Sequence, residues 1–193
     1  MDQNLILIIS YSYILGSIPF GLLITKFFLK KDLRKMGSGN IGATNVLRTG
    51  KKSLALITLF LDTLKGYGVI ALTSKFFPEF TYFSGLICFI GHIFPIWLKF
   101  SGGKGVATYL GIILAISIKL GIIFGISWLL ILYLTRYSSL ASVLSSLNIF
   151  LFSLYSNSID LDFIYLTFFV IIVFTHRENL IRLKNGSEDK IKF

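Results

Sequence analysis

The sequence predicts an all-α integral membrane protein: a bundle of seven transmembrane helices, some of them short, with the N-terminus outside and the C-terminus in the cytoplasm. Hydrophobic residues make up 54% of the 193 positions, whereas charged residues make up only 15%. The mean hydropathy is +0.79, well above that of a soluble domain. The charged residues also gather between long apolar blocks. We expect residues 1–193 to form a single polytopic membrane domain.

Apolar blocks follow one another along the whole chain. The first three have the roughly 20 residues needed to cross a hydrocarbon core of about 30 Å, and the later ones are shorter. The fourth block is marginal, so we expect it to tilt or to cross a locally thinned bilayer. Because the N-terminus lacks the basic cluster and cleavage site of a signal peptide, we expect the first block to remain as a span. The blocks are 4–29, 53–74, 80–98, 105–118, 121–135, 140–155 and 163–174.

The distribution of basic residues predicts the orientation. Cytoplasmic loops of membrane proteins carry an excess of Lys and Arg. With the N-terminus outside, all but three of the nineteen Lys and Arg residues lie on or toward the cytoplasmic side. Lys75 and Lys119 fall outside, and Lys65 lies within a span. An odd number of spans is needed to keep the basic tail inside, and seven fits the block lengths better than five.

A polar loop at residues 37–48, GSGNIGATNVLR, separates the first two blocks. Its glycines let backbone N–H groups approach a bound anion. Its arginine can form paired hydrogen bonds with a phosphate. The loop matches G-x-G-x-x-G, but a dinucleotide fold needs a preceding strand, and an apolar helical block precedes it here. A phosphate site is our interpretation, and a flexible polar connector is the alternative. The residues expected at the site are Ser38, Gly39, Asn40, Thr44, Asn45 and Arg48.

A second loop, SGGK at 101–104, opens the fourth block. It resembles the end of a Walker A loop, but Gly105 stands where Ser or Thr is required, so nucleotide hydrolysis is unsupported. We expect free N–H groups of Gly102 and Gly103, the helix dipole and the Lys104 ammonium to converge on an anion. The alternative is a tight interhelical turn with a lysine that reaches the membrane surface.

Charged residues also occur inside the second block. Asp62 and Lys65 are three positions apart and therefore share one helix face, with Thr58 beside them. Charges within a span are costly and usually face the bundle interior at functional sites. We expect Lys65 to support the charge of a substrate pocket. The alternative is a neutral ion pair that only locks helix packing.

The tail motif HREN completes the polar groups of the cytoplasmic face. His176 ends the last block, and Asn179 faces the same way if the helix continues. His176 could orient a substrate hydroxyl or phosphate, or carry a proton. Ser139 is a weaker candidate hydrogen-bond donor next to Arg136, which could equally anchor the topology. His92, within the third block, reads as a hydrogen-bonded packing residue.

Several function classes are excluded or disfavoured. The sequence lacks HExxH, Cys/His clusters and repeated acidic motifs, so we expect no metal and no cofactor. No Asp stands five residues after either histidine, which removes the H-x4-D signature of CoA-dependent glycerolipid acyltransferases. The net charge of +10 reflects loops that face anionic lipid, and we expect no nucleic-acid partner. Cys88 is the sole cysteine, so an intrachain disulfide is impossible.

Taken together, these motifs resemble the bacterial acyl-phosphate:glycerol-3-phosphate acyltransferases, the PlsY family. The resemblance covers nearly the whole chain. One feature varies, because Ile41 stands where many relatives carry Pro. The motifs that carry it are GSIPFG (16–21), GSGNIGATNVLR (37–48), LDTLKG (61–66), GHIFPIWLKFSGGKGVAT (91–108) and HRENLIRL (176–183).

The resemblance implies a multi-pass enzyme of the bacterial inner membrane with its active site at the cytoplasmic face. It implies transfer of a fatty acyl group from acyl phosphate to the 1-hydroxyl of glycerol 3-phosphate, the first step of phospholipid synthesis. We expect a monomer that is surrounded by membrane lipid and linked functionally to an enzyme that produces acyl phosphate. The implied catalytic residues are Arg48, Lys104, His176 and Asn179. The implied substrate-binding residues are Ser38, Gly39, Asn40, Thr44, Asn45, Lys65, Gly102, Gly103 and Ser139.

Two other classes of protein are alternatives to an acyltransferase. A transporter of an anion or phosphorylated solute could line a path with the same basic motifs, but the outer loops carry few polar groups to complete it. An assembly or scaffold protein would leave the Gly-rich loops unexplained. The proton acceptor for the substrate hydroxyl is open between a substrate phosphate and His176.

Overall fold

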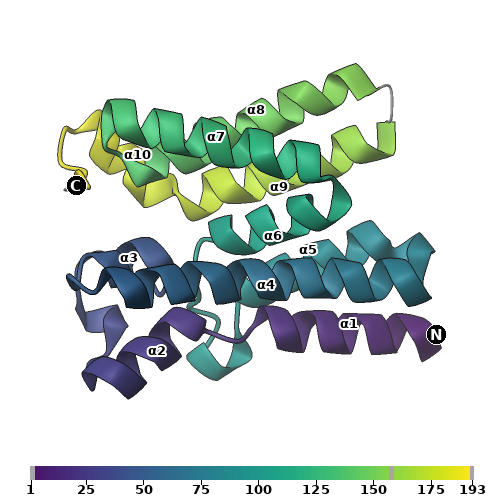
Figure 1. Cartoon of the computed structure of the whole chain (residues 1–193), viewed down its shortest axis with the longest axis horizontal. Helices are drawn as coiled ribbons and strands as arrows, with labels where there is room; N and C mark the ends of the chain where they lie inside the picture. Colours follow the sequence, from purple (N-terminus) through teal and green to yellow (C-terminus); the bar gives the residue numbers. More distant parts are fainter. Residues whose placement is uncertain (1–2, 157–158, 192–193) are drawn as a thin grey trace. The chain divides into compact units, whose positions relative to one another are not determined.

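The computed structural model describes residues 3–156 and 159–191, and within these ranges all regular structure is helical (Figure 1). The α-helices are α1 (Gln3–Gly16), α2 (Phe20–Leu29), α3 (Ala43–Leu47), α4 (Lys52–Phe76), α5 (Thr81–Ile93), α6 (Val106–Ile116), α7 (Ile118–Thr135), α8 (Ser138–Ser153), α9 (Ile159–Thr175) and α10 (Arg177–Lys184). Short 3₁₀ turns lie at η1 (Leu33–Lys35), η2 (Pro78–Phe80), η3 (Ile96–Leu98) and η4 (Leu154–Ser156).

The chain divides into two compact units. Unit 1 is Met1–Ile116 and unit 2 is Ser117–Phe193. In unit 1, α4 packs against α6, α5, α3, α2 and α1. In unit 2, α8 packs against both α7 and α9, and α10 follows α9 at the end where α8 begins (Figure 1). The single membrane domain expected from the sequence stays a prediction.

Each predicted apolar block corresponds to a helix or a pair of helices. Among the described residues, four helical segments are long and apolar enough to cross a membrane, and a fifth qualifies if α9 and α10 count as one bent span. Helices α6 and α8 are apolar but shorter. A multi-pass membrane protein is therefore supported, whereas seven crossings and the orientation of the termini stay predictions.

The apolar side chains of α7 show what surrounds this fold. Many of them are exposed, for example 68% at Ile118 and 71% at Leu134, whereas Phe124 and Leu132 are buried. An exposed apolar surface of this extent disfavours water and suits lipid tails. The helix begins earlier than expected, because the Ser117 hydroxyl accepts a hydrogen bond from the Leu120 N–H at 3.4 Å and caps it. Lys119 therefore lies in the first turn of α7 and not in a loop between blocks.

Close helix contacts in unit 1 depend on glycine. A Cβ atom on Gly66 of α4 would collide with the Thr108 carbonyl oxygen of α6, and one on Gly111 of α6 would collide with the Thr63 carbonyl oxygen. Gly16 of α1 and Gly91 of α5 allow the same close backbone approach between these two helices. Small residues at such crossings let backbones approach closely, which is how helices associate where lipid removes the hydrophobic driving force.

The first span is broken between α1 and α2. Pro19 cannot donate a backbone hydrogen bond, and the chain bends at 17–19. Side chains from other helices bind the carbonyl groups that this break exposes. The Trp97 indole N–H donates to the Ser17 carbonyl at 3.0 Å, and the Lys65 ammonium donates to the Ile18 carbonyl at 2.9 Å. These two hydrogen bonds therefore stabilise the break between α1 and α2.

Candidate active site

Asn45 organises the loop at 37–48. Its side chain is 2% exposed, and its Oδ1 accepts a hydrogen bond from the Ser38 N–H at 3.0 Å. Its Nδ2 donates to the carbonyl groups of Leu33, Met36 and Asn40 at 3.2, 2.9 and 2.8 Å. These contacts use the amide to hold the loop in one shape. Asn45 is therefore a structural centre of the loop, not one of its ligand-facing groups.

The loop is also tied to the helices beneath it. Ile41 is 2% exposed and packs in a cluster with apolar residues of α2, α3 and α4. Gly21 of α2 lies directly under it, where a Cβ atom would collide with the Ile41 carbonyl oxygen. The Asn40 Oδ1 accepts from the Gly42 N–H at 2.9 Å, so this side chain also bonds inside the loop. A flexible connector does not fit this packing.

Backbone shape at the start of the loop requires glycine. Gly37 has φ +52°, and a Cβ atom there would collide with the Asn45 side chain. The same Cβ would lie 3.3 Å from the Arg48 Cδ, so the Arg48 side chain passes beside Gly37. Ser38 and Gly39 are exposed, and Thr44 and Arg48 are half-buried. These four residues form the part of the loop that a ligand can reach.

The SGGK loop differs from the expectation in one respect. The N–H groups of Gly102 and Gly103 donate to the carbonyl groups of Ile93 and His92 at 3.0 and 3.1 Å. They are therefore already paired, and the prediction that both amides are free to bind an anion is wrong. The glycines instead allow a close approach, because a Cβ atom on Gly103 would collide with the His92 Nε2. Lys104, half-buried, remains the candidate cation of this loop.

A buried polar cluster of Asp62, Lys65 and His92 lies beside that loop. The Lys65 Nζ lies 2.8 Å from the Asp62 Oδ1, 2.8 Å from the His92 Nδ1 and 2.9 Å from the Ile18 carbonyl oxygen. The contact with Asp62 is an ion pair, whereas the contacts with His92 and the Ile18 carbonyl are hydrogen bonds. Lys65 is therefore buried and held by partners within unit 1, and its support of a substrate pocket stays a prediction. The cluster fixes His92, which is hydrogen-bonded as expected and supports Gly103.

In unit 2, His176 lies at a bend. The helix does not continue straight past this residue, because α9 and α10 meet there at an angle of 60°. His176 is 3% exposed, and its Nδ1 lies 2.8 Å from the Ile172 carbonyl oxygen. A carbonyl oxygen only accepts, so Nδ1 carries the proton and Nε2 carries the lone pair in the neutral ring.

Asn179 and Ser139 meet on a carboxylate that the sequence did not single out. The Glu188 Oε1 accepts from the Asn179 Nδ2 at 2.6 Å and from the Ser139 hydroxyl at 2.7 Å. Its Oε2 accepts from the Arg182 Nε at 2.8 Å. Burial raises the pKa of Glu188, but hydrogen bonds from Asn179, Ser139 and Arg182 and the Arg182 charge outweigh it, so the pKa is lowered and the side chain is ionised at neutral pH.

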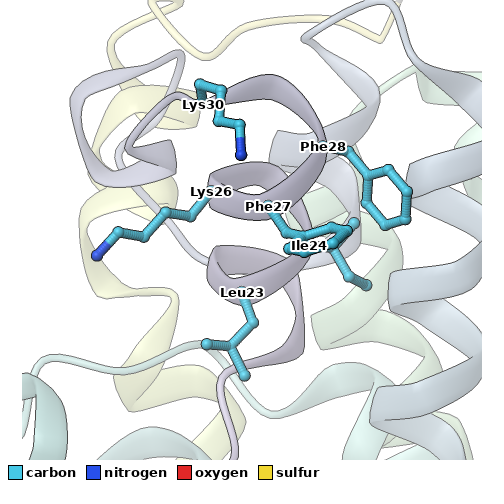
Figure 2. Close-up of a pocket in the computed structure, with 6 residues that line it drawn as sticks. All are labelled: Leu23, Ile24, Lys26, Phe27, Phe28 and Lys30. Carbon is cyan, nitrogen blue, oxygen red and sulfur yellow. The ribbon is translucent and has the colours of Figure 1, made fainter.

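An open hollow of about 760 Å³ lies along α2 (Figure 2). The side chains of Leu23, Ile24, Phe27 and Phe28 line it, with Lys26 and Lys30 at its border. Its lining holds none of the predicted site residues, and Phe27 and Phe28 are 69% and 59% exposed. We therefore interpret this hollow as part of the lipid-facing surface. Among residues 3–156 and 159–191, no cluster of three or more His, Cys, Asp and Glu side chains is placed to hold a metal ion.

Comparison with known proteins decides the family. The sequence profile of glycerol-3-phosphate acyltransferase matches residues 6–186, nearly the whole chain. This chain belongs to the glycerol-3-phosphate acyltransferase family. A relative of that name from Pelagibacter ubique (strain HTCC1062) is 50% identical over 181 residues, which are 94% of each chain. Another, from Mesorhizobium japonicum, is 45% identical over 99% of this chain and 98% of its own.

Solved structures agree with this assignment to the acyltransferase family. The crystal structure of PlsY (YgiH), an integral membrane glycerol 3-phosphate acyltransferase, in its glycerol 3-phosphate form, is 37% identical with a TM-score of 0.92. The alignment covers 97% of this chain and 95% of that one. The lysophosphatidic acid form of the same protein matches with a TM-score of 0.89 and the same coverage.

Each unit of this acyltransferase-family chain thus brings part of the predicted site together. Unit 1 holds the loop, Lys104 and the buried Lys65 cluster, and unit 2 joins Ser139 to Asn179. Sequence reasoning missed Glu188, which lies beyond HRENLIRL in a tail that looks like ordinary solvated polar chain. The available signal was the GSE segment after a helix rich in basic residues, where Gly ends the helix and a carboxylate follows.

Proposed function

We propose that this chain transfers a fatty acyl group from acyl phosphate to the 1-hydroxyl of sn-glycerol 3-phosphate. The products are lysophosphatidic acid and inorganic phosphate, and the reaction begins phospholipid synthesis. The observation that carries the proposal is the match over 97% of the chain to PlsY in its glycerol 3-phosphate form. Membership of the glycerol-3-phosphate acyltransferase family supports the acceptor, and the lack of H-x4-D supports a donor other than acyl-CoA.

Acyl phosphate is a mixed anhydride and therefore already activated. The acceptor hydroxyl oxygen attacks the acyl carbon, the bond from that carbon to the phosphate oxygen breaks, and phosphate leaves with its electron pair. The hydroxyl proton passes to a phosphate oxygen of a substrate. Catalysis then consists mainly of bringing two anions together and stabilising the oxyanion that develops on the acyl carbonyl.

We assign the phosphate contacts to unit 1. Arg48 and Lys104 neutralise substrate phosphates, since both are half-buried cations next to loops of fixed shape. Ser38, Gly39 and Thr44 offer short polar groups on the reachable side of the loop. Asn40 and Asn45 hold the loop from within. Gly102 and Gly103, which precede Lys104, pack closely against His92, and Lys65 holds His92 in place.

We assign contacts with glycerol 3-phosphate to unit 2. We place glycerol 3-phosphate against His176 and Asn179, which lie at the bend between α9 and α10. Asn179 orients the same substrate, and Ser139 supports Asn179 through Glu188.

The membrane arrangement belongs to the same proposal. Seven crossings with the N-terminus outside place the loop at 37–48, SGGK and the HREN motif at the cytoplasmic face of the bacterial inner membrane. Basic residues partition in that way, and glycerol 3-phosphate is a cytoplasmic solute that could reach this face. We propose a monomer that receives its acyl phosphate from a donor-producing enzyme and its acyl chain through the surrounding lipid.

The decisive assay uses purified protein in lipid nanodiscs with glycerol 3-phosphate and either palmitoyl phosphate or palmitoyl-CoA, without added metal and with chelator present. We expect lysophosphatidic acid and phosphate in equal amounts from palmitoyl phosphate and none from palmitoyl-CoA. Equal product from palmitoyl-CoA in the absence of acyl phosphate, or complete loss of activity with chelator, would overturn the proposal.

A further inference from the structure

The two sides of α2 differ in burial. Leu22 and Ile24 are 8% and 7% exposed and pack in the apolar cluster beneath the polar loop. Leu23, Phe27 and Phe28 are 50%, 69% and 59% exposed. The rings of the two phenylalanines meet edge to face, with their centres 5.0 Å apart. One side of α2 therefore supports the loop, while the other side presents large apolar side chains to the surroundings.

Lysines gather at the border of this apolar surface. Lys26 and Lys30 lie at the edge of the hollow along α2, and Figure 2 shows the Lys26 side chain pointing away from Phe28. The Lys30 Nζ lies 5.5 Å from the centre of the Phe27 ring, so the stem of this lysine follows the apolar surface. The neighbouring lysines at positions 31 and 35 are exposed, as are Lys26 and Lys30.

Few acidic residues balance this positive charge. Positions 3–61 hold a single acidic residue, Asp32. Arg34 donates hydrogen bonds of 3.0 and 2.7 Å to that carboxylate, and these contacts lower the pKa of Asp32 to about 2. Within the part of the chain that the structure describes, neither Lys26 nor Lys30 forms an ion pair with a carboxylate. The surface therefore keeps an excess of positive charge that an external anion can neutralise.

An anionic phospholipid matches both parts of this surface. Its acyl chains suit the apolar side chains, and its phosphate suits the ammonium groups at their border. A soluble anion would leave the apolar lining against water, and a zwitterionic lipid would add no net negative charge to balance the lysines. A second copy of the chain in a symmetric contact would bring like charges together. The lining of the hollow also holds none of the residues that we assign to substrates, which argues against a site for the acyl donor.

We propose that the outer side of α2 is a binding site for an anionic phospholipid. One acyl chain lies against Leu23, Phe27 and Phe28, and the headgroup phosphate lies between Lys26 and Lys30. This lipid is not a substrate, so the inference goes beyond the proposed function and does not depend on it.

Native mass spectrometry of the delipidated protein in detergent tests this site. The probes are dioleoyl phosphatidylglycerol, which is anionic, and dioleoyl phosphatidylcholine, which has the same chains and no net charge. We expect the first phosphatidylglycerol to bind roughly 10- to 30-fold more tightly, because each lysine beside an anionic lipid contributes about a factor of five. In the double variant Lys26→Gln/Lys30→Gln this preference should fall to within about threefold, and each single variant should lose about fivefold.

The double variant Lys75→Gln/Lys119→Gln is the matched control. It removes the same charge from two exposed lysines whose Nζ atoms lie 5.3 and 5.2 Å from the centre of a phenylalanine ring. Neither lysine borders the hollow, so this variant should keep the wild-type preference. Phe27→Ala tests the apolar part, and it should weaken the binding of both lipids by a similar factor without changing the preference between them.

Several results would overturn the proposal. Equal affinity of the wild-type protein for the two lipids would do so, and so would an equal loss of preference in the two double variants, because charge alone would then explain binding. Unchanged binding in Phe27→Ala would show that no acyl chain lies in the hollow. Displacement of phosphatidylglycerol by millimolar inorganic phosphate would show a simple anion site, and displacement by an equimolar amount of palmitoyl phosphate would show a donor site. A dimer that phosphatidylglycerol dissociates would assign this surface to a second copy of the chain.

Discussion

Arg48 and Lys104 are the two cations that we place against substrate phosphates. Replacing either with Ala removes a charge-assisted contact in a partly desolvated site, worth roughly 2–4 kcal/mol. At about 1.4 kcal/mol per tenfold, the rate per folded molecule should fall roughly 30- to 1000-fold. Arg48→Lys should restore activity only in part, because an ammonium cannot form the paired hydrogen bonds of a guanidinium. Initial rates in nanodiscs, normalised to folded protein, measure this.

Lys119 provides the control for these substitutions. It lies in the first turn of α7, is exposed, and its Nζ lies 5.2 Å from the centre of the Phe152 ring. Lys119→Ala should leave the rate nearly unchanged. If Arg48→Ala and Lys104→Ala turn over as fast as Lys119→Ala, then neither cation contacts a substrate phosphate.

His176 separates two routes for the hydroxyl proton. Glutamine can accept a hydrogen bond through its amide oxygen but is not a base at neutral pH. If a substrate phosphate takes the proton, His176→Gln should keep activity within about tenfold of wild type, whereas His176→Leu should lose much more. If His176 itself is the base, both variants should lose the roughly 100- to 10,000-fold typical of general-base catalysis. Single-turnover rates of the two variants distinguish these routes.

At the scale of elements, the packing of α4 against α6 depends on one face of α4. Gly66→Ala adds a methyl group against the Thr108 carbonyl oxygen, with the Ile112 Cγ1 at 3.2 Å, and should cost about 1–3 kcal/mol of stability through overpacking. Gly68→Ala, two residues on in the same helix, meets nothing within 4 Å. It should be neutral or gain up to about 1 kcal/mol from helix propensity. Thermal unfolding midpoints in one detergent compare the two; equal midpoints would contradict the close contact.

The helices were predictable because each buried or lipid-facing segment is a long apolar block. Their ends were less so. The start of α7 depends on the Ser117 hydroxyl, and the chain bends at His176 between α9 and α10. These features come from single hydrogen bonds and local backbone angles, which an apolar block does not encode.

The candidate site was also predictable only in part. Residue types in the loop and in HREN indicated polar sites at 37–48 and at His176, but not which groups face a ligand. Asn45 and the Gly102 and Gly103 amides look identical in sequence to ligand groups, yet they bond within the chain. Glu188 was invisible because its partner Ser139 is 49 positions away in the sequence. Pairings over such distances are set by tertiary packing.

At the scale of the whole molecule, the prediction that remains is topology. In a Cys88→Ala background, Lys51→Cys and Ser101→Cys should react with a membrane-impermeant maleimide only after the cells are opened, and Glu79→Cys should react in intact cells. All three native side chains are exposed, so access to each position depends on the side of the membrane and not on burial. Labelling of positions 51 and 101 from outside would reverse the orientation and remove the active site from the cytoplasmic face.

The lysine in the middle of α4 has a consequence for how this family changes over time. Lys65 joins the Asp62 carboxylate, the His92 ring and the carbonyl group exposed by the broken first span. Losing Lys65 alone would leave the Asp62 carboxylate without a countercharge inside a membrane bundle, and losing Asp62 alone would leave the Lys65 ammonium without one. Lineages should therefore keep these residues or exchange them as a set. In an alignment of relatives, substitutions at positions 62, 65 and 92 should occur on the same branches of the tree.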